Sequence, residues 1–126
     1  MSNDILTFFD RGGRAVAYLY DEEYIYLYNG TPVGFLHDDE FVYNYRGKYL
    51  GTFVDGWVRD RFGRCVFFTE DASGGPARPA RHARPARSAR HARPARAARE
   101  ARSARAARAV AWSDFDTDGF FSSGTT

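Results

Sequence analysis

The feature that most constrains this chain is an internal repeat in its first 75 residues. Glycines recur at Gly13, Gly30, Gly47 and Gly63, at spacings of 17, 17 and 16 residues. An apolar residue precedes each glycine by five positions, an aliphatic residue follows it by three, and an aspartate follows it by eight. These residues are Phe8, Ile25, Val42 and Val58; Val16, Val33, Leu50 and Val66; and Asp21, Asp38, Asp55 and Asp71. A fixed period of this kind predicts four copies of one structural unit.

Each unit predicts two short strands. The segment 24–28 alternates tyrosine with aliphatic residues, which indicates a strand with two different faces. The glycine turns, such as Asn29-Gly30, predict two-residue hairpin turns because glycine accepts a positive φ. The acidic segments at the aspartates predict a second set of exposed turns. We therefore expect a mostly β fold: four hairpins of about 17 residues closing into a shallow, pseudo-fourfold barrel without unpaired edges.

The position four residues after each glycine is expected to lie near the symmetry axis. It holds Ala17, Gly34, Gly51 and Phe67. Small side chains here leave room for a pore or an apolar ligand, whereas Phe67 predicts a plug. Both a filled and an open axis fit the sequence, and these four residues are the candidate lining of an axial channel.

The net charge of +2 is a sum over three unlike segments. Residues 1–75 carry 7 Lys and Arg against 12 Asp and Glu, a balance of −5, together with 17 aromatic residues. Residues 76–108 carry 11 Arg and one Glu, a balance of +10, and residues 109–126 carry three Asp. The chain thus divides into an acidic aromatic head, a basic arm and a short aromatic closure.

The arm consists of eleven consecutive x-Ala-Arg triplets. A period of three matches polyproline II geometry, in which all arginines lie along one edge and the arm spans about 100 Å. The residues 97–111 lack Pro and Gly and are also compatible with a helix. A free arm of this composition is expected to be disordered. The three conformations remain open.

The arginines of the arm are the candidate polyanion-binding residues, because guanidinium groups stay charged and bind phosphate with two hydrogen bonds. They are Arg78, Arg81, Arg84, Arg87, Arg90, Arg93, Arg96, Arg99, Arg102, Arg105 and Arg108. An anionic lipid or membrane surface, a nucleic acid, and the chain's own acidic head all match this charge. The closing aromatics, which include Trp112, Phe120 and Phe121, predict docking on the head, with membrane insertion as the alternative.

Other functional classes have little support in the sequence. Cys65 is a lone cysteine, expected to be a small buried residue in a strand. The aspartates of the repeat are expected to be turn residues rather than metal ligands. His37, His82 and His91 have no metal-binding spacing, and no nucleophile motif or phosphate-binding glycine loop is present. No signal peptide or run of about 20 apolar residues is visible, so we expect a cytoplasmic protein, able to associate peripherally with a membrane, without a cofactor or metal.

Several segments resemble the bacterial four-fold beta-flower family in order along the chain. They are 28–33, 50–60, 63–70, 72–76, Trp112-Ser113 and Phe120-Phe121. This chain has Ala-Arg in the period-3 arm where the family usually has Leu-Lys. The resemblance implies a shallow symmetric barrel with petal-like hairpins, similar in general shape to lipid-binding tubby-like domains. It implies no activity and no functional residue.

Together these observations predict a non-enzymatic binding or scaffold protein that attaches through its basic arm to an anionic partner, with a membrane surface or lipid preferred. The arm also resembles the basic tails of chromatin-type proteins, which makes a nucleic-acid-associated protein the first alternative. An apolar small-molecule or lipid carrier that uses the axial channel is the second alternative.

Overall fold

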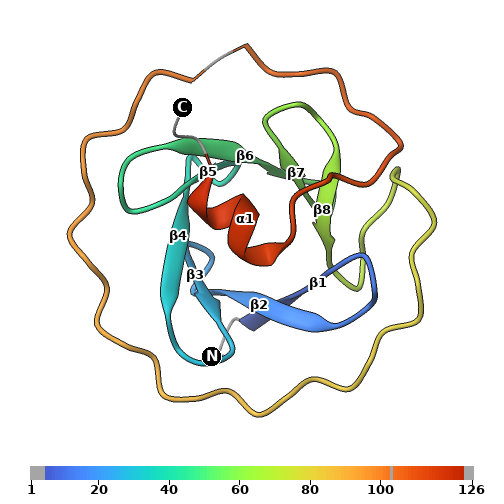
Figure 1. Ribbon diagram of the computed structural model, residues 1–126, viewed down its shortest axis with the longest axis horizontal. Helices are drawn as coiled ribbons and strands as arrows, with labels where there is room; N and C mark the ends of the chain where they lie inside the picture. The colour runs from blue at the N-terminus through green and yellow to red at the C-terminus, as the bar shows by residue number, and fades with distance from the viewer. Residues whose placement is uncertain (1–4, 103, 124–126) are drawn as a thin grey trace.

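Eight antiparallel strands form a closed barrel in which each strand pairs with its neighbours in the chain and β8 returns to β1 (Figure 1). The computed structural model describes residues 5–102 and 104–123. The elements are β1 (Ile5–Phe9), β2 (Ala15–Tyr20), β3 (Tyr24–Leu27), β4 (Pro32–His37), β5 (Phe41–Tyr43), β6 (Tyr49–Val54), β7 (Trp57–Asp60), β8 (Cys65–Phe68) and α1 (Thr117–Ser122). The predicted fold class, a mostly β barrel of four hairpins, is confirmed.

Both faces of the barrel wall are buried, by different side chains. In β3, Ile25 points into the barrel interior, where it joins the aliphatic core. Tyr24 and Tyr26 lie on the outer face and pack with Tyr18 of β2. The alternation of tyrosine and aliphatic residues therefore corresponds to two different faces of the strand, as predicted. The outer face differs from an ordinary solvent-facing sheet surface because it carries a second layer of aromatic packing.

The glycine turns have a different geometry from the predicted two-residue turn. Around Gly30, the Gly30 N–H bonds Leu27 O at 3.0 Å and the Leu27 N–H bonds Thr31 O at 2.9 Å, so the loop has three residues. Only the glycine has a positive φ there, +93°, and the strand register shifts beside the loop. A three-residue loop that ends in a left-handed glycine and a bulge has these features. The prediction of two-residue turns at the glycines was wrong.

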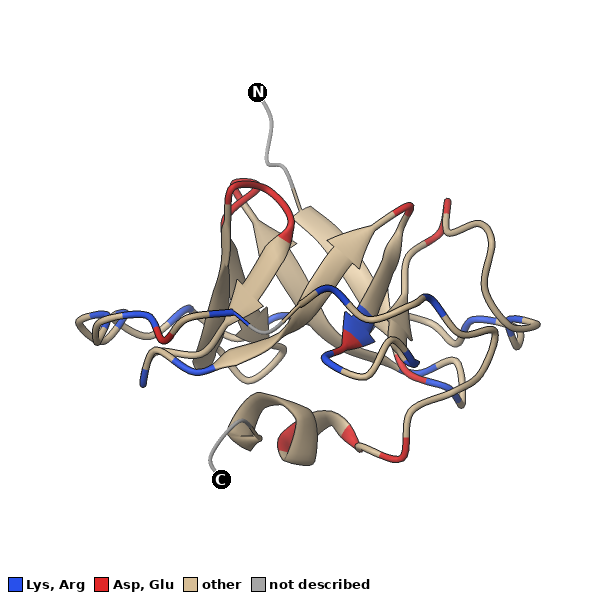
Figure 2. Ribbon diagram, turned by 90° about the horizontal axis from the view of Figure 1, so that it is seen from above, with Lys and Arg blue, Asp and Glu red and all other residues tan. Residues whose placement is uncertain are grey.

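Consecutive residues with positive φ occur instead at the aspartate turns. Asp21 and Glu22 have φ values of 56° and 60°, and Asp55 and Gly56 have values of 56° and 82°. Two successive positive φ values define a type I′ turn, whose twist matches that of the flanking strands. Aspartate tolerates this conformation because its short side chain hydrogen-bonds locally. The acidic turns lie at the end of the barrel opposite α1 (Figure 2).

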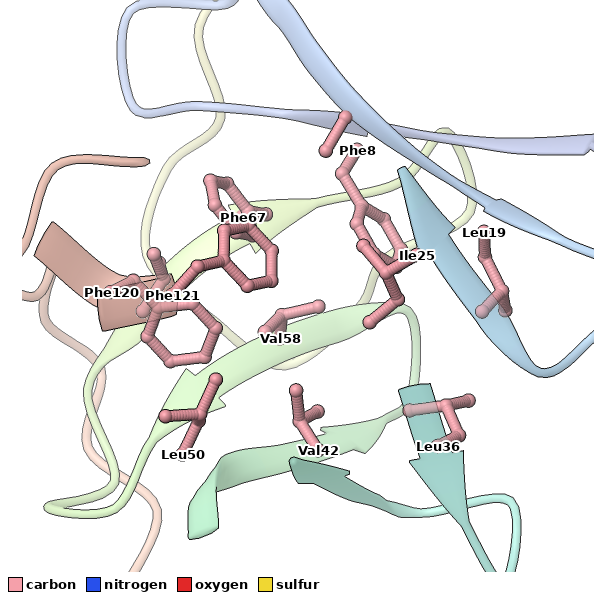
Figure 3. Close-up of a cluster of buried hydrophobic side chains, with 12 residues drawn as sticks. Phe8, Leu19, Ile25, Leu36, Val42, Leu50, Val58, Phe67, Phe120 and Phe121 are labelled. Atoms are coloured by element: carbon pink, nitrogen blue, oxygen red, sulfur yellow. The ribbon is translucent and has the colours of Figure 1, made fainter. Parts of the chain in front are cut away.

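The closure docks on the head, as predicted. The helix α1 covers one end of the barrel, and its Phe120 and Phe121 are buried in the same core as Phe8 and Phe67 (Figure 3). The rings of Phe67 and Phe121 stack with centroids 5.7 Å apart. The Asn44 side chain donates a hydrogen bond to Phe121 O at 3.1 Å. Within the described residues, no helix is both long and apolar enough to span a bilayer.

The candidate axial residues lie in or beside this packed interior. Ala17 and Phe67 are fully buried members of the core. A Cβ atom on Gly34 would lie 2.7 Å from Tyr43 O and 3.7 Å from the Phe121 ring, and one on Gly51 would lie only 1.8 Å from Arg59 O, so both glycines permit close contact between neighbouring strands. Side chains of the closure also occupy space beside Gly34.

Residues 76–108, called the belt below, encircle the barrel from the outside (Figure 1). Their described residues contain neither helix nor strand. The helix considered for 97–111 was therefore wrong for the residues that the structure describes. The Ala97 N–H donates to Tyr45 O at 3.0 Å and the Glu100 N–H donates to Gly47 O at 2.9 Å. The Ala109 N–H donates to Gly63 O at 3.0 Å, whereas a helix over 97–111 would bond that N–H to the carbonyl oxygen four residues earlier.

Candidate functional site

The belt is docked on the barrel in a repeating register. The N–H groups of His82, His91 and Glu100 donate to the carbonyl oxygens of Gly13, Gly30 and Gly47 at 2.8, 2.9 and 2.9 Å, and Ala109 N–H donates to Gly63 O at 3.0 Å. Successive donors are nine residues apart in the chain, or three triplets for each hairpin. Because nine is a multiple of three, an extended helix with three residues per turn presents the same edge at each hairpin.

The repeat glycines are required by this docking. A Cβ atom built on Gly13, Gly30, Gly47 or Gly63 would lie 2.0–2.1 Å from the carbonyl oxygen of Ala80, Ala89, Ala98 or Ala107, respectively. All four glycines also have positive φ values, between 83° and 93°. Each glycine therefore serves two purposes, the left-handed turn and the close approach of the belt.

Arginines of the belt stack on the aromatic layer of the outer barrel face. The guanidinium carbons of Arg90, Arg93, Arg96 and Arg102 each lie 3.8 Å from a ring centroid, over Tyr20, Tyr24, Phe35 and Phe41, respectively. Arg93 also donates a hydrogen bond to the Tyr26 hydroxyl at 3.0 Å. A stacked guanidinium uses its face for the ring and keeps its N–H edges for hydrogen bonds. Each exposed contact of this kind contributes about 0.5–1 kcal/mol.

Carboxylates of the head form a second set of contacts with the belt. The ion pairs are Arg81–Glu70 at 3.8 Å, Arg96–Glu23 at 2.5 Å, Arg105–Glu40 at 2.7 Å and Arg108–Asp55 at 3.1 Å. These arginine side chains are 36–56% exposed, so each pair contributes about 0–1 kcal/mol. The acidic head thus holds the basic arm within one molecule.

The remaining candidate arginines make looser contacts. Arg87 and Arg99 lie 5.6 and 5.9 Å from the ring centroids of Tyr18 and Tyr43, and Arg78 donates to Glu70 O at 3.1 Å. Arg84 occupies the same place in the nine-residue unit as the stacked Arg93 and Arg102, and it is exposed. Indeed all eleven candidate arginines are exposed. The structure brings them onto one ring around the barrel (Figure 2).

The fourth hairpin departs from the symmetry. Four residues before the repeat glycines stand Phe9, Tyr26, Tyr43 and, in the fourth unit, Arg59. The Arg59 side chain is buried and donates to Gly63 O at 2.9 Å and to Ala109 O at 2.6 Å. It binds the end of the belt by hydrogen bonds in the place where the other hairpins have aromatic rings.

The tip of the fourth hairpin carries an exposed apolar patch. Phe62 and Val110 are 62% and 73% exposed and are the exposed large hydrophobic residues of the described chain. Val110 lies beside the tip because its neighbours Ala109 and Ala111 bond to Gly63 and Cys65. The guanidinium carbon of Arg61 lies 5.4 Å from the Phe62 ring centroid, and Arg61 lines a small pocket with Arg105, Arg108 and the carboxylates of Glu40 and Asp60. We call Phe62, Val110, Arg61, Arg105 and Arg108 the tip patch.

Burial raises the pKa of Tyr45 to about 12; a smaller upward contribution comes from Tyr26 and opposing ones from Arg96 and Arg93. Because the folded pKa exceeds the ordinary value of 10.0, this group stabilises the fold below pH 10, and that contribution is lost as pH rises towards about 12. We expect the free energy of unfolding to fall less steeply across this window in Tyr45→Phe than in the original chain. Urea unfolding at several alkaline pH values measures both slopes, and equal slopes would contradict this assignment.

The negative charge of the head predicted contact with the arm. The nine-residue register of the belt and the stacking of its arginines on aromatic rings were not predicted from the sequence. A sequence signal for the register does exist. Pro76, Pro85 and Pro94 are nine residues apart, and so are His82 and His91. These three prolines fall in the triplet whose x residue donates no N–H to the barrel, whereas Pro79 falls in the triplet of the donors Ser88 and Ala97.

Lone Cys65 is buried in β8, as expected. Trp57 is buried against Phe68 and Trp112 and is therefore a packing residue. Comparison with curated proteins and with solved structures gave no match. The model of one family, described as 4-fold beta flower protein, matches residues 6–121, which include the barrel, the belt and α1. The chain belongs to the 4-fold beta flower family.

Proposed function

We propose that this protein is a non-enzymatic module that attaches peripherally to an anionic membrane surface through the tip patch. The observation that carries the proposal is the exposure of Phe62 and Val110 together with the position of Arg61, whose guanidinium carbon lies 5.4 Å from the Phe62 ring centroid. An apolar side chain that enters the headgroup region and cations that contact acidic headgroups are the two signals that stable peripheral binding combines.

The position of Phe62 within the repeat supports this function. The equivalent residue before the repeat glycine is Gly12, Asn29 or Arg46 in the other hairpins. An exposed phenylalanine contributes nothing to the core, whereas its transfer from water to an apolar phase is favourable by about 1.5–3 kcal/mol. The tip patch is thus a local departure from symmetry that fits contact with an apolar layer.

The packing of the closing aromatic residues and of the barrel interior bears on the alternative functions, a carrier and a nucleic-acid-binding protein. Trp112, Phe120 and Phe121 pack on the head, so in this proposal the apolar contact is made by Phe62 and Val110 rather than by these three aromatic residues. A carrier function would require the buried phenylalanines of the interior to move aside. A nucleic acid would bind the exposed arginines of the belt, and a gel shift with DNA tests this alternative.

The membrane function is tested by Phe62→Ser, with Asn29→Ser at the equivalent tip of the second hairpin as the matched control. Binding to vesicles containing about one-third phosphatidylserine is expected to weaken about tenfold in Phe62→Ser, because the apolar contact is lost. The control is expected to bind the anionic vesicles like the original chain. Neutral vesicles are expected to bind none of the three proteins. Co-sedimentation measures each affinity.

Equal binding by Phe62→Ser and the original chain would contradict the proposal. A gel shift with duplex DNA, run in parallel at several salt concentrations, gives the competing result. Tight DNA binding that falls steeply with salt, without vesicle binding, would assign the arginines to nucleic acid instead.

A further inference from the structure

We propose that the outer face of the barrel is a recognition surface for extended peptides with an arginine at every third residue. Its own belt occupies this surface, and a peptide of the same pattern from another chain binds there when the belt is released. This inference concerns the outer aromatic face and does not depend on membrane binding.

The surface is built from repeated peptide-binding elements. Gly13, Gly30 and Gly47 each present a carbonyl oxygen that accepts a belt N–H, and none leaves room for a Cβ atom under the belt carbonyl. Tyr28 O and Tyr45 O accept further N–H groups from Ser88 and Ala97, at 2.9 and 3.0 Å. Backbone acceptors beside aromatic rings are how other proteins recognise extended polyproline II segments.

The belt shows which features of a ligand are recognised. Arginine faces stack on aromatic rings at 3.8 Å in four places, so a planar cation is favoured at every third residue. The x residues vary between Pro, His, Ser, Ala and Glu. Among them, the Glu100 side chain contacts the barrel, where it accepts a hydrogen bond from Tyr49 N–H at 3.0 Å and pairs with Lys48 at 3.7 Å. Among the x residues, His82, Ser88 and His91 donate backbone N–H groups to the barrel, whereas Pro85 has none to donate; Pro79, nine residues before Ser88, also has none.

The belt competes with any outside peptide because it is part of the same molecule. A tethered segment has an effective concentration in the millimolar range, so a free peptide at lower concentration does not displace it. Substitutions in the belt alone weaken this competition and leave the barrel residues intact. The triple variant Arg90→Ala, Arg93→Ala, Arg96→Ala removes three of the closest stacking contacts, all around the second hairpin.

The experiment is a titration of the full-length triple variant with a fluorescent peptide of residues 82–99. Release of the belt is verified first by hydrogen exchange of the His91 amide, which Gly30 O protects in the docked state. If that amide stays protected, Arg99→Ala and Arg102→Ala are added. Two control peptides have the same charge: one has proline at every x position, and the other has lysine for every arginine.

The released variant is expected to bind the native peptide about tenfold more tightly than either control, and more tightly than the original chain binds it. The all-proline peptide loses the four N–H donors of His82, Ser88, His91 and Ala97 while it keeps the extended conformation. The lysine peptide loses the planar stacking. Equal affinity for all three peptides, or no binding by the released variant, would overturn the inference.

Discussion

Replacing Phe120 by alanine is expected to lower the free energy of unfolding by about 3–5 kcal/mol, a large part of the stability of a domain of this size. The Phe120 ring is fully buried and contacts Phe67 and Phe121 edge-to-face, at centroid distances of 5.7 and 5.1 Å. The six-residue helix α1 is too short to be stable by itself, so its place depends on these contacts. Urea unfolding followed by far-UV circular dichroism measures the change.

Phe62→Ala is the matched control, because it makes the same substitution at a residue that is 62% exposed. Its effect on stability is expected to stay within about 0.5 kcal/mol, as for most surface substitutions. Similar midpoints for Phe120→Ala and Phe62→Ala would show that α1 does not belong to the cooperative core.

The barrel could be predicted because its information is local and repeated. The four glycines and the alternation in β3 set the strand number and the two faces without knowledge of distant contacts. The turn geometry was harder, since both glycine and aspartate accept positive φ values. The hydrogen bonds of Leu27 with Gly30 and Thr31 distinguish a three-residue loop from a two-residue turn. A separate register shift lies between Ile25 and Tyr26, opposite Val33.

The conformation of the belt could not be predicted from its own residues. The composition of 97–111 suits a helix, yet the N–H of Ala109, which a helix would bond internally, donates to Gly63 O of the barrel. Long-range contacts therefore overrode the local propensity. Packing of the belt on the outer aromatic face of the head was not predicted from the sequence. Tyr20 and Tyr24 face away from the aliphatic core, and Arg90 and Arg93 of the belt cover them.

Gly47→Ala is expected to produce the second large effect, a loss of about 2–4 kcal/mol of stability together with local release of the belt. The new Cβ atom would lie 2.0 Å from Ala98 O, so the belt has to move and the bond from Glu100 N–H to Gly47 O is lost. The φ of +83° adds about 1–2 kcal/mol of backbone strain for a residue with a side chain. Hydrogen exchange of the Glu100 amide reports the release, and urea unfolding reports the stability.

Gly74→Ala separates backbone strain from belt contact. Gly74 has nearly the same φ, +81°, but a Cβ atom there meets no atom within 4 Å. This control is expected to cost only the strain, about 1–2 kcal/mol, and to leave the Glu100 amide protected. If Gly47→Ala and Gly74→Ala lose the same stability and neither releases the belt, the glycines of the repeat serve the turns alone. A larger loss in Gly47→Ala means that the 17-residue repeat is also constrained by the nine-residue register of the belt that encircles it.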